Sequence, residues 1–510
     1  MTGRSAWPHH VGILNDYVRI PYANGSSFAS QFLYRSFVAR GHRVTVVGPH
    51  DPDARAAELP RHHVCLPSLP MRNHPGLYMP MPTPGGISAV EQLGLDVALG
   101  QSGSELADLG VWLRWRQNIP YMCVNTIHLP KVYNVLLPDR LAANRAVVSL
   151  FENQIIPMVE RHSARVYNQT DGLIVLSRGL ERYWRERGVT APIHVIPRAV
   201  DPSIFDRPRG DDPFPAGVPR GGRLLCVCRQ TREKNVVRLL DIFARHLAGV
   251  MPEVTLTLVG DGPDFDAFVD HAARLGIGDR VHFVGEHRLH DIPRFYRHAD
   301  LFVFTSLSET YGQVISEAMW CGLPVVALDD SMGVAQQVED RVDGILVMPG
   351  PDEQKANWRF AKEVFTLIRD VPRRRALSEA AARRVQRRAD PARCIQRYYE
   401  AFAEARAHCH ADAERRRGAP YEHLKTVGRW TSVHTLLVTL GLLRPPATIN
   451  RHGRRQPGWE EVARATPRDP DVAARLMGDA LDGLEPNPGP GAEGTLSRFA
   501  AAYRLVSSPP

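Results

Sequence analysis

Runs of consecutive apolar residues alternate with stretches of helical period through the first half of this chain. Within each run the apolar residues are continuous, which is typical of strands that are buried on both faces of a parallel sheet. The runs cover residues 11–14, 44–47, 95–99, 121–125 and 173–176. Residues 26–39 predict a helix between the first two runs, and Gly41 follows its last turn, where glycine commonly ends a helix.

The alternation stops and then restarts in the second half of the chain. Residues 202–222 are rich in Pro, Gly, Asp and Arg, a composition that indicates a linker. The second series has predicted strands at 224–227, 255–259, 281–284, 301–304 and 324–327, and predicted helices at 235–247, 265–275, 292–298 and 314–321. Two such series predict an α/β protein in which two doubly wound, Rossmann-like domains face each other across a cleft.

These breaks divide the chain into four predicted parts. Residues 1–198 form the first domain and residues 199–390 the second. A helix at 391–405 is expected to return to the first domain, and residues 406–510 form an extension whose role cannot be read from the sequence. Residues 60–86 are rich in Pro, Met and His without any period, so we expect a long loop there.

The composition restricts the class of protein but does not identify its ligand. The chain has 510 residues and a net charge of +8, a balance that suits phosphate-bearing ligands, nucleic acid or an anionic membrane surface alike. Seven cysteines without a CxxC pair indicate a reducing compartment and no zinc site. Residues 430–443 are too few to cross a bilayer, which needs about 20 residues, and no secretory signal is visible. We therefore expect a cytoplasmic protein.

Two glutamates border the end of the predicted strand at 301–304. The carboxylate of Glu309 lies just past that end, where it can accept hydrogen bonds from sugar hydroxyls. Gly312 lets backbone amides approach a ligand closely, and the helix that begins there offers its N-terminus to phosphate. Glu317 lies about one turn into this helix and can grip a ribose diol. Acidic residues also favour helix starts for structural reasons alone, but the strand, glycine and helix around both glutamates favour a ligand site.

Two cations flank the turn after the predicted strand at 224–227. Arg229 and Lys234 can converge on a leaving nucleoside diphosphate and stabilise the negative charge that grows as the glycosidic bond breaks. A surface turn with no ligand is the alternative interpretation of these two residues.

Taken in order, these motifs resemble the donor domain of the group 1 (family 4) retaining glycosyltransferases, which have the GT-B fold. The segments that carry the resemblance are 229–234, 258–262 (LVGDG), 283–285 (FVG), 309–317 and 317–326 (EAMWCGLPVV). Segments 41–47, 125–130, 171–177 and 195–201 resemble the family's acceptor domain more loosely. The resemblance covers residues 10–405, and it is specific for the family but not for its substrate.

The resemblance implies a role for each matching residue. Glu309 would hold the donor hexose, Glu317 the ribose, and Arg229 and Lys234 the diphosphate. His128 would contact the transferred sugar, with a packed or capping histidine as the alternative. The other implied donor-binding residues are Asn24, Gly25, Tyr311, Gly312, Gln313 and Val314.

Three positions depart from the family pattern. Asn24 stands where the family has the first glycine of a phosphate loop, although asparagine tolerates left-handed backbone better than most residues. Ala199 replaces a glycine, and residues 334–336 (VAQ) replace a Pro-Glu pair.

The implied activity is retaining transfer of a hexose, of the glucose or mannose type, from a nucleotide-diphosphate sugar that serves as co-substrate. No cofactor and no metal is expected, because Arg229, Lys234 and a helix N-terminus can neutralise the diphosphate. The DxD pattern of metal-dependent glycosyltransferases occurs at 51–53, 264–266 and 469–471. Three matches in one chain indicate that this pattern arises easily.

The acceptor is expected on the first domain, and the second is expected to bind the donor. The segment 130–141 contains Arg140 and the apolar residues Tyr133, Val135, Leu136, Leu137 and Pro138. Together with Arg145 and Arg161, it would suit peripheral contact with an anionic membrane and a lipid or glycolipid acceptor. Ordinary core packing explains the same apolar residues, and a soluble sugar remains an alternative acceptor.

Three other classes of protein share some of these features. A dinucleotide-dependent oxidoreductase is disfavoured because no GxGxxG opens the first helix. A nucleic-acid partner is not expected, because the arginines are scattered and no binding motif accompanies them. A sugar-nucleotide-binding protein without transferase activity remains the main alternative, and the sequence does not choose between UDP-glucose, GDP-mannose and other donors.

Overall fold

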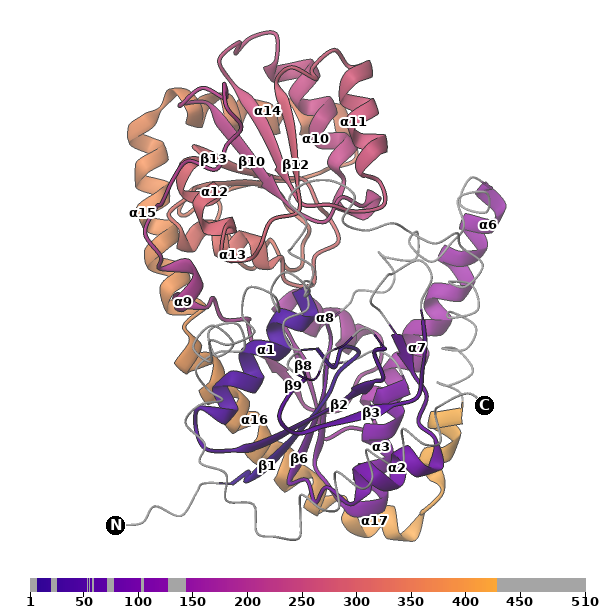
Figure 1. Cartoon of the computed structure of the whole chain (residues 1–510). Coiled ribbons are helices and arrows are strands. Elements are labelled where there is room, and N and C mark those ends of the chain that lie inside the picture. Colours follow the sequence, from indigo (N-terminus) through magenta and orange to yellow (C-terminus); the bar gives the residue numbers. More distant parts are fainter. Residues whose placement is uncertain are drawn as a thin grey trace.

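The computed structural model describes residues 7–19, 25–52, 54, 56, 59–70, 78–101, 105–126 and 144–428. Figure 1 shows two lobes, each built on a sheet with helices around it. In the described part of the chain both of these sheets are parallel throughout. The prediction of two doubly wound sheets is therefore confirmed.

The first sheet has the strand order β3-β2-β1-β6-β7-β8-β9. Its strands are β1 (His10–Leu14), β2 (Arg43–Pro49), β3 (His63–Leu66), β6 (Val97–Gly100), β7 (Tyr121–Val124), β8 (Gly172–Val175) and β9 (Ile193–Val195). The helices of this lobe are α1 (Gly25–Val38), α2 (Pro84–Glu91), α3 (Glu105–Gln117), α6 (Arg145–Leu150), α7 (Ile156–Tyr167) and α8 (Arg178–Glu186). A π-helical turn, η2 (Phe151–Ile155), joins α6 to α7, and this long helix projects from the lobe in Figure 1.

The second sheet has the strand order β12-β11-β10-β13-β14-β15. Its strands are β10 (Arg223–Val227), β11 (Thr255–Val259), β12 (Val281–Gly285), β13 (Leu301–Phe304), β14 (Val325–Leu328) and β15 (Ile345–Val347). Its helices are α10 (Val236–Ile242), α11 (Phe265–Arg274), α12 (Ile292–His298), α13 (Gln313–Trp320), α14 (Glu353–Arg369) and α15 (Val371–Arg388). A π-helical turn, η4 (Phe243–Leu247), extends α10.

Each lobe has its own core. The strands of both sheets are almost fully buried, which agrees with their continuous apolar sequence. The chain crosses between the lobes twice, near Val200 and near Ala389. The two crossing segments run side by side, because the backbone N–H of Val200 donates to the carbonyl of Ala389 over 3.1 Å. The second crossing leads into α16 (Pro391–Ala411), whose Tyr398 and Phe402 pack into the core of the first lobe.

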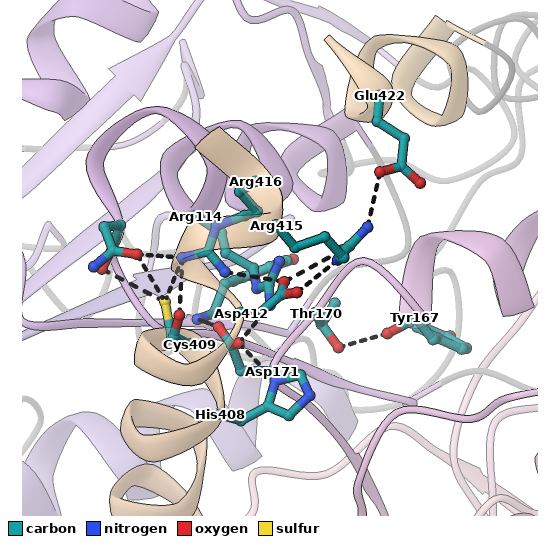
Figure 2. Close-up of polar contacts among 12 residues, drawn as sticks. Arg114, Tyr167, Thr170, Asp171, His408, Cys409, Asp412, Arg415, Arg416 and Glu422 are labelled. Atoms are coloured by element: carbon teal, nitrogen blue, oxygen red, sulfur yellow. Dashed lines mark hydrogen bonds and ion pairs between the residues drawn. The ribbon is translucent and has the colours of Figure 1, made fainter. Parts of the chain in front are cut away.

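A group of charged residues holds the end of α16 and α17 (Ala413–Gly418) against the first lobe, and we call it the C-terminal clamp (Figure 2). Arg114 on α3 contacts Asp171 and Asp412, each over 2.8 Å. The Nδ1 of His408 lies 2.9 Å from the same oxygen of Asp171, Oδ1, that Arg114 contacts, and Arg416 lies 3.1 Å from Asp412. Asp171 is fully buried and also accepts the first backbone N–H of β7. The clamp thus ties the C-terminal helices to the strand starts of the first sheet.

Several predicted segments differ from the structure. Residues 60–86 were expected to be a loop, but they contain the edge strand β3, the hairpin of β4 (Ser68–Pro70) and β5 (Tyr78–Pro80), and the start of α2. The expected linker at 202–222 begins with α9 (Pro202–Phe205), and its Phe214 and Val218 pack into the second core. The expected helix at 391–405 runs on to residue 411. The unpredicted elements β3, β4, β5 and α9 have only three or four residues each. Such short elements show no clear periodicity in the sequence, and they form because of tertiary contacts.

None of the described helices combines the length and apolar composition that a bilayer span requires.

Candidate active site

The candidate site lies where the order of strands in the second sheet reverses. β10 neighbours β11 on one side and β13 on the other, with Leu224 paired to Leu301 and Leu225 to Phe302. In doubly wound sheets, ligands bind beyond the carboxyl ends of the two strands at such a switch point. The loops that follow β10 and β13 carry Arg229, Lys234 and Glu309, so the topology brings the predicted residues to the expected edge.

Hydrogen bonds tie these two loops together. Asn235 has a φ of 58°, a left-handed conformation that asparagine tolerates. Its side chain donates to the carbonyl of Thr305 over 3.0 Å, and the Thr305 hydroxyl donates back to the carbonyl of Asn235 over 3.0 Å. The hydroxyl of Ser308 adds a bond to the carbonyl of Glu233 over 3.1 Å. The loops are therefore held in register before any ligand arrives.

Lys234 and Glu309 form an ion pair across these loops. Lys234 lies in the short 3-10 turn η3 (Arg232–Lys234), and its Nζ is 2.7 Å from Oε1 of Glu309. The Ser306 hydroxyl donates to the same oxygen over 2.7 Å. The side chains are 21% and 11% exposed. Burial alone would lower the pKa of Lys234, but the charge of Glu309 and its hydrogen bond hold that pKa above the usual value.

The helix after Glu309 starts as the sequence predicts. Gly312 is the N-cap of α13 with a φ of 77°, and none of the described side chains caps the helix. Val314 lies in the first turn. The Gln313 side chain donates to the carbonyl of Ala199 over 3.2 Å, and Tyr311 is buried at the junction of the lobes, where its hydroxyl lies 3.1 Å from the Ser316 hydroxyl. The side chains of Gln313 and Tyr311 therefore make contacts within the protein.

Glu317 lies one turn into α13 and is almost fully buried. The hydroxyl of Tyr296 on α12 donates to its Oε2 over 3.0 Å, and its Oε1 makes no hydrogen bond with a described residue. Burial raises the pKa of Glu317 to about 7, although Tyr296 and the charge of Arg198 act against this rise. The carboxyl group thus changes its charge near neutral pH.

Arg229 lies on the same loop as Lys234, directly after β10. Its charge acts on Glu286, which follows β12, and burial together with the charge of Asp261 raises the pKa of that glutamate to about 7. Gly260 has a φ of 130°, and a Cβ there would lie 1.9 Å from the carbonyl oxygen of Cys228. Only glycine allows this approach of the loops after β10 and β11.

Three further predicted residues precede the second lobe in the sequence. Gly25 is the first residue of α1. Asn24 and His128 lie outside the described residues. Two residues before His128 in the sequence, the carbonyl of Thr126 accepts a hydrogen bond from the Thr310 hydroxyl over 3.2 Å. This bond joins the two lobes beside Glu309.

Four residues around the site were not predicted. Tyr296 and Ser306 donate hydrogen bonds to the predicted glutamates, and the charges of Arg198 and Glu286 act on predicted site residues. In the sequence, Arg198 is the single charged residue of an apolar segment between the two domains, and this pattern could have indicated a site residue. Tyr296 lies on a helix whose sequence does not indicate a ligand. In the described part of the chain, no three His, Cys, Asp or Glu side chains gather in a way that would hold a metal ion.

Family models match both lobes. The model described as "Glycosyl transferases group 1" matches residues 217–384, and "Glycosyltransferase Family 4" matches residues 24–204. The chain is 25% identical over 329 residues to the alpha-monoglucosyldiacylglycerol synthase of Streptococcus pneumoniae, an alignment that covers 62% of this chain and 70% of that protein. It is 30% identical over 280 residues to the D-inositol 3-phosphate glycosyltransferase of Mycobacterium leprae, covering 53% of this chain and 60% of that protein. The chain thus spans about 60% of the inositol 3-phosphate enzyme's length.

Solved structures share the fold. HepE of Anabaena, crystallised with UDP and glucose, superposes with a TM-score of 0.58 at 20% identity, covering 78% of this chain and 99% of that one. Sucrose-phosphate synthase of Thermosynechococcus elongatus superposes with a TM-score of 0.56 at 21% identity, covering 77% and 99%. These superpositions show that the chain has the GT-B fold. The two family models, which match residues 24–204 and 217–384, show that the chain belongs to the group 1 (family 4) glycosyltransferases.

Proposed function

We propose that this chain transfers a hexose of the glucose or mannose type from a nucleotide-diphosphate sugar to an acceptor hydroxyl, with retention of the anomeric configuration. The observation that carries the proposal is the Lys234–Glu309 pair at the switch point of the second sheet. A cation suited to a diphosphate and a carboxylate suited to sugar hydroxyls lie side by side in this pair, and this supports a sugar diphosphate as the ligand.

Each side chain has a role in this proposal. Lys234 and Arg229 bind the diphosphate, together with the uncapped N-terminus of α13. Oε1 of Glu309 is engaged by Lys234 and Ser306, so Oε2 accepts from the hexose hydroxyls. Oε1 of Glu317 accepts from the ribose hydroxyls, because Tyr296 occupies the other oxygen. The roles of Asn24, Gly25 and His128 rest on the family resemblance.

The proposed chemistry is displacement on one face of the sugar. The bond from the anomeric carbon to the phosphate oxygen breaks, and the bond to the acceptor oxygen forms on the same face. The departing phosphate oxygen takes the proton of the acceptor hydroxyl. Lys234 and Arg229 stabilise the charge on the leaving nucleoside diphosphate, which favours bond breaking.

We also propose that the reaction needs no metal ion. In two of the DxD matches, one aspartate forms an ion pair with an arginine. Asp51 lies 2.5 Å from Arg19, and Asp264 lies 3.2 Å from Arg232. These carboxylates therefore already pair with cations of the protein, and we propose that Lys234 and Arg229 neutralise the diphosphate in place of a metal ion.

A panel of nucleotide sugars tests the proposed function. Purified protein is incubated with UDP-glucose, GDP-mannose and related donors, with and without EDTA, and release of the nucleoside diphosphate is measured. We expect turnover of at least one donor that EDTA does not abolish, and loss of turnover in Glu309→Ala and Arg229→Ala. Binding of a donor without release or transfer would instead support a sugar-nucleotide-binding protein. The anomeric configuration of the product, read by NMR, tests retention.

A lipid or glycolipid acceptor is the second part of the proposal. The helix formed by α6, η2 and α7 projects from the first lobe, and it exposes Leu150 by 54% with Arg145 and Arg161 also exposed. Apolar and cationic side chains together suit the surface of an anionic bilayer. We expect the protein to sediment with vesicles containing phosphatidylglycerol, and Leu150→Asp to weaken this. Failure to bind such vesicles, with turnover on soluble sugars, would favour a soluble acceptor.

A further inference from the structure

The loop that follows β14, residues 330–335, packs against the backbone that carries Glu309. The N–H of Gly333 donates to the carbonyl of Glu309 over 3.2 Å. A Cβ on Gly333 would lie 2.7 Å from that carbonyl oxygen and 2.7 Å from the backbone N and Cα of Tyr311. Backbone atoms cannot turn aside as the end of a side chain can, so only glycine allows this close approach. The loop is thus fitted against the segment that holds the proposed sugar-binding carboxylate.

The carboxylate of Asp330 fixes the shape of this loop. Its Oδ1 accepts hydrogen bonds from the N–H groups of Met332 and Ala335, over 2.9 and 3.0 Å. Its Oδ2 accepts from those of Gly333 and Val334, over 3.1 Å each. Hydrogen bonds to a charged acceptor are about twice as strong as those between neutral groups. Four of them on one carboxylate join four consecutive residues, so a displacement of Met332 is passed on to Gly333.

The first lobe touches the same loop through α8. Figure 1 shows α8 at the end of the first lobe that faces the second. Gly179 lies in the first turn of this helix, and a Cβ on it would lie 2.8 Å from the Cα of Met332 and 2.8 Å from the carbonyl oxygen of Ser331. The side chain of Met332 packs against the core of the first lobe. The loop therefore contacts the first lobe at residues 331–332 and the Glu309 backbone at residue 333.

We propose that Gly333 is a positioning residue, and that the loop at 330–335 transmits the contact with Gly179 on the first lobe to the carboxylate of Glu309. This inference rests on the proposed function, in which Glu309 accepts from the hexose hydroxyls of the donor. Groups that bind a reacting ligand must be held to within about 0.5 Å of their working position. The first lobe thereby sets how firmly the second lobe holds the hexose, although Gly179 itself is not among the residues assigned to the donor.

Gly333→Ala should weaken binding of the hexose and leave binding of the diphosphate nearly unchanged. The new Cβ needs a separation of about 3.4 Å instead of 2.7 Å, so the backbone at Glu309 must move by roughly half an ångström. If a misplacement of 1 Å costs about 100-fold, half of that costs about tenfold. The Kd of the nucleotide sugar should therefore rise about tenfold, whereas the Kd of the free nucleoside diphosphate, which Lys234 and Arg229 bind, should change less than about twofold.

Gly179→Ala should give the same pattern from the other lobe. Alanine is a better helix former than glycine by about 1 kcal/mol, so α8 itself is not weakened. The new Cβ meets backbone atoms of Ser331 and Met332 and displaces the loop. The double variant should bind the nucleotide sugar little worse than the poorer single variant, because both changes act through one loop.

The experiment measures both dissociation constants by isothermal titration calorimetry, with the nucleotide sugar that the wild type turns over and with its free nucleoside diphosphate. The controls are Gly85→Ala and Gly278→Ala. Gly85 is, like Gly179, the second residue of a helix in the first lobe, and Gly278 lies in the second lobe; a Cβ on either control would have nothing within 4 Å. Both controls should leave both constants unchanged. If Gly333→Ala does not fold, Asp330→Asn replaces it, because the amide nitrogen cannot accept from two N–H groups and so releases the loop without added bulk.

The outcomes separate this inference from the proposed function. A wild type that binds no nucleotide sugar would overturn both. A wild type that binds and turns over a donor, with Gly333→Ala at the wild-type ratio of the two constants, would overturn only the role of the loop. A selective loss in Gly333→Ala that Gly179→Ala does not share would overturn the link to the first lobe. Equal losses of both affinities, together with a lower melting temperature, would show that Gly333 supports the fold alone.

Discussion

Replacing Lys234 by methionine removes the counterion of Glu309 while keeping a side chain of similar length. The Lys234 Nζ lies 2.7 Å from Oε1 of Glu309, and both side chains are less than one quarter exposed, so solvent screens the pair only partly. A hydrogen bond to a charged group contributes about 1.5–3 kcal/mol to stability. In a lobe of this size that loss corresponds to a fall in melting temperature of roughly 3–10 °C.

Activity should fall more steeply than stability. Lys234 is proposed to bind the leaving diphosphate, and removing one such charged group costs about 10²- to 10³-fold in turnover. Glu309→Gln should be comparably damaging, and the double variant should be little worse than the poorer single variant, because groups that act as a unit are not additive.

The assay is kcat/KM for nucleoside diphosphate release, with melting followed by circular dichroism. Lys355→Met is the matched control. Lys355 also pairs with a carboxylate, Asp352 at 3.3 Å, but the lysine is 75% exposed and lies on α14. Such a surface pair contributes at most about 1 kcal/mol, so its loss should leave activity unchanged. If Lys234→Met behaves like Lys355→Met in both measurements, the assignment of the ion pair to the donor site is refuted.

Other perturbations test separate parts of the account. Arg114→Met, which removes the central cation of the C-terminal clamp, should lower the free energy of unfolding in urea by about 3–5 kcal/mol, because the buried carboxylate of Asp171 loses its arginine partner; a loss below 1 kcal/mol would contradict a buried network. Gly260→Ala should lower the melting temperature and weaken donor binding, because its Cβ would meet a backbone oxygen at 1.9 Å. Gly249→Ala, where nothing lies within 4 Å, should do neither. The raised pKa of Glu317, about 7, means that its stabilising contribution is complete below about pH 4.5 and is lost as pH rises through 7. Relative to Glu317→Gln, the ligand-free wild type should therefore melt at a lower temperature at pH 8 than at pH 5, and identical profiles would contradict this.

Much of the fold could be predicted from the sequence because its strands are continuous apolar runs. Each predicted strand overlaps an observed one, and Gly41 ends α1 with a φ of 84°. The edge strands β3, β9 and β15 could not be predicted in the same way, since each has only three or four residues and β3 contains a histidine and a cysteine. Short edge strands depend on the neighbour that they pair with, and a local pattern does not contain that information.

The candidate site was predictable where residues follow a strand directly. Glu309, Gly312 and Lys234 lie where strand, turn and helix order places them. The helix α12 brings Tyr296 to Glu317, and the packing of the lobes brings Tyr311 to the backbone carbonyl of Arg198. Such contacts join elements that are distant in the sequence, so they follow from the packing of the lobe and not from a motif.

Hydrogen–deuterium exchange with and without nucleotide sugar tests most directly whether a donor binds at the carboxyl ends of the second sheet. With saturating UDP-glucose or GDP-mannose, the account predicts slower exchange in residues 229–235 and 306–317, and unchanged exchange in α17 and the C-terminal clamp. Protection confined to the first lobe, or no protection in either loop with a donor that is turned over, would contradict it.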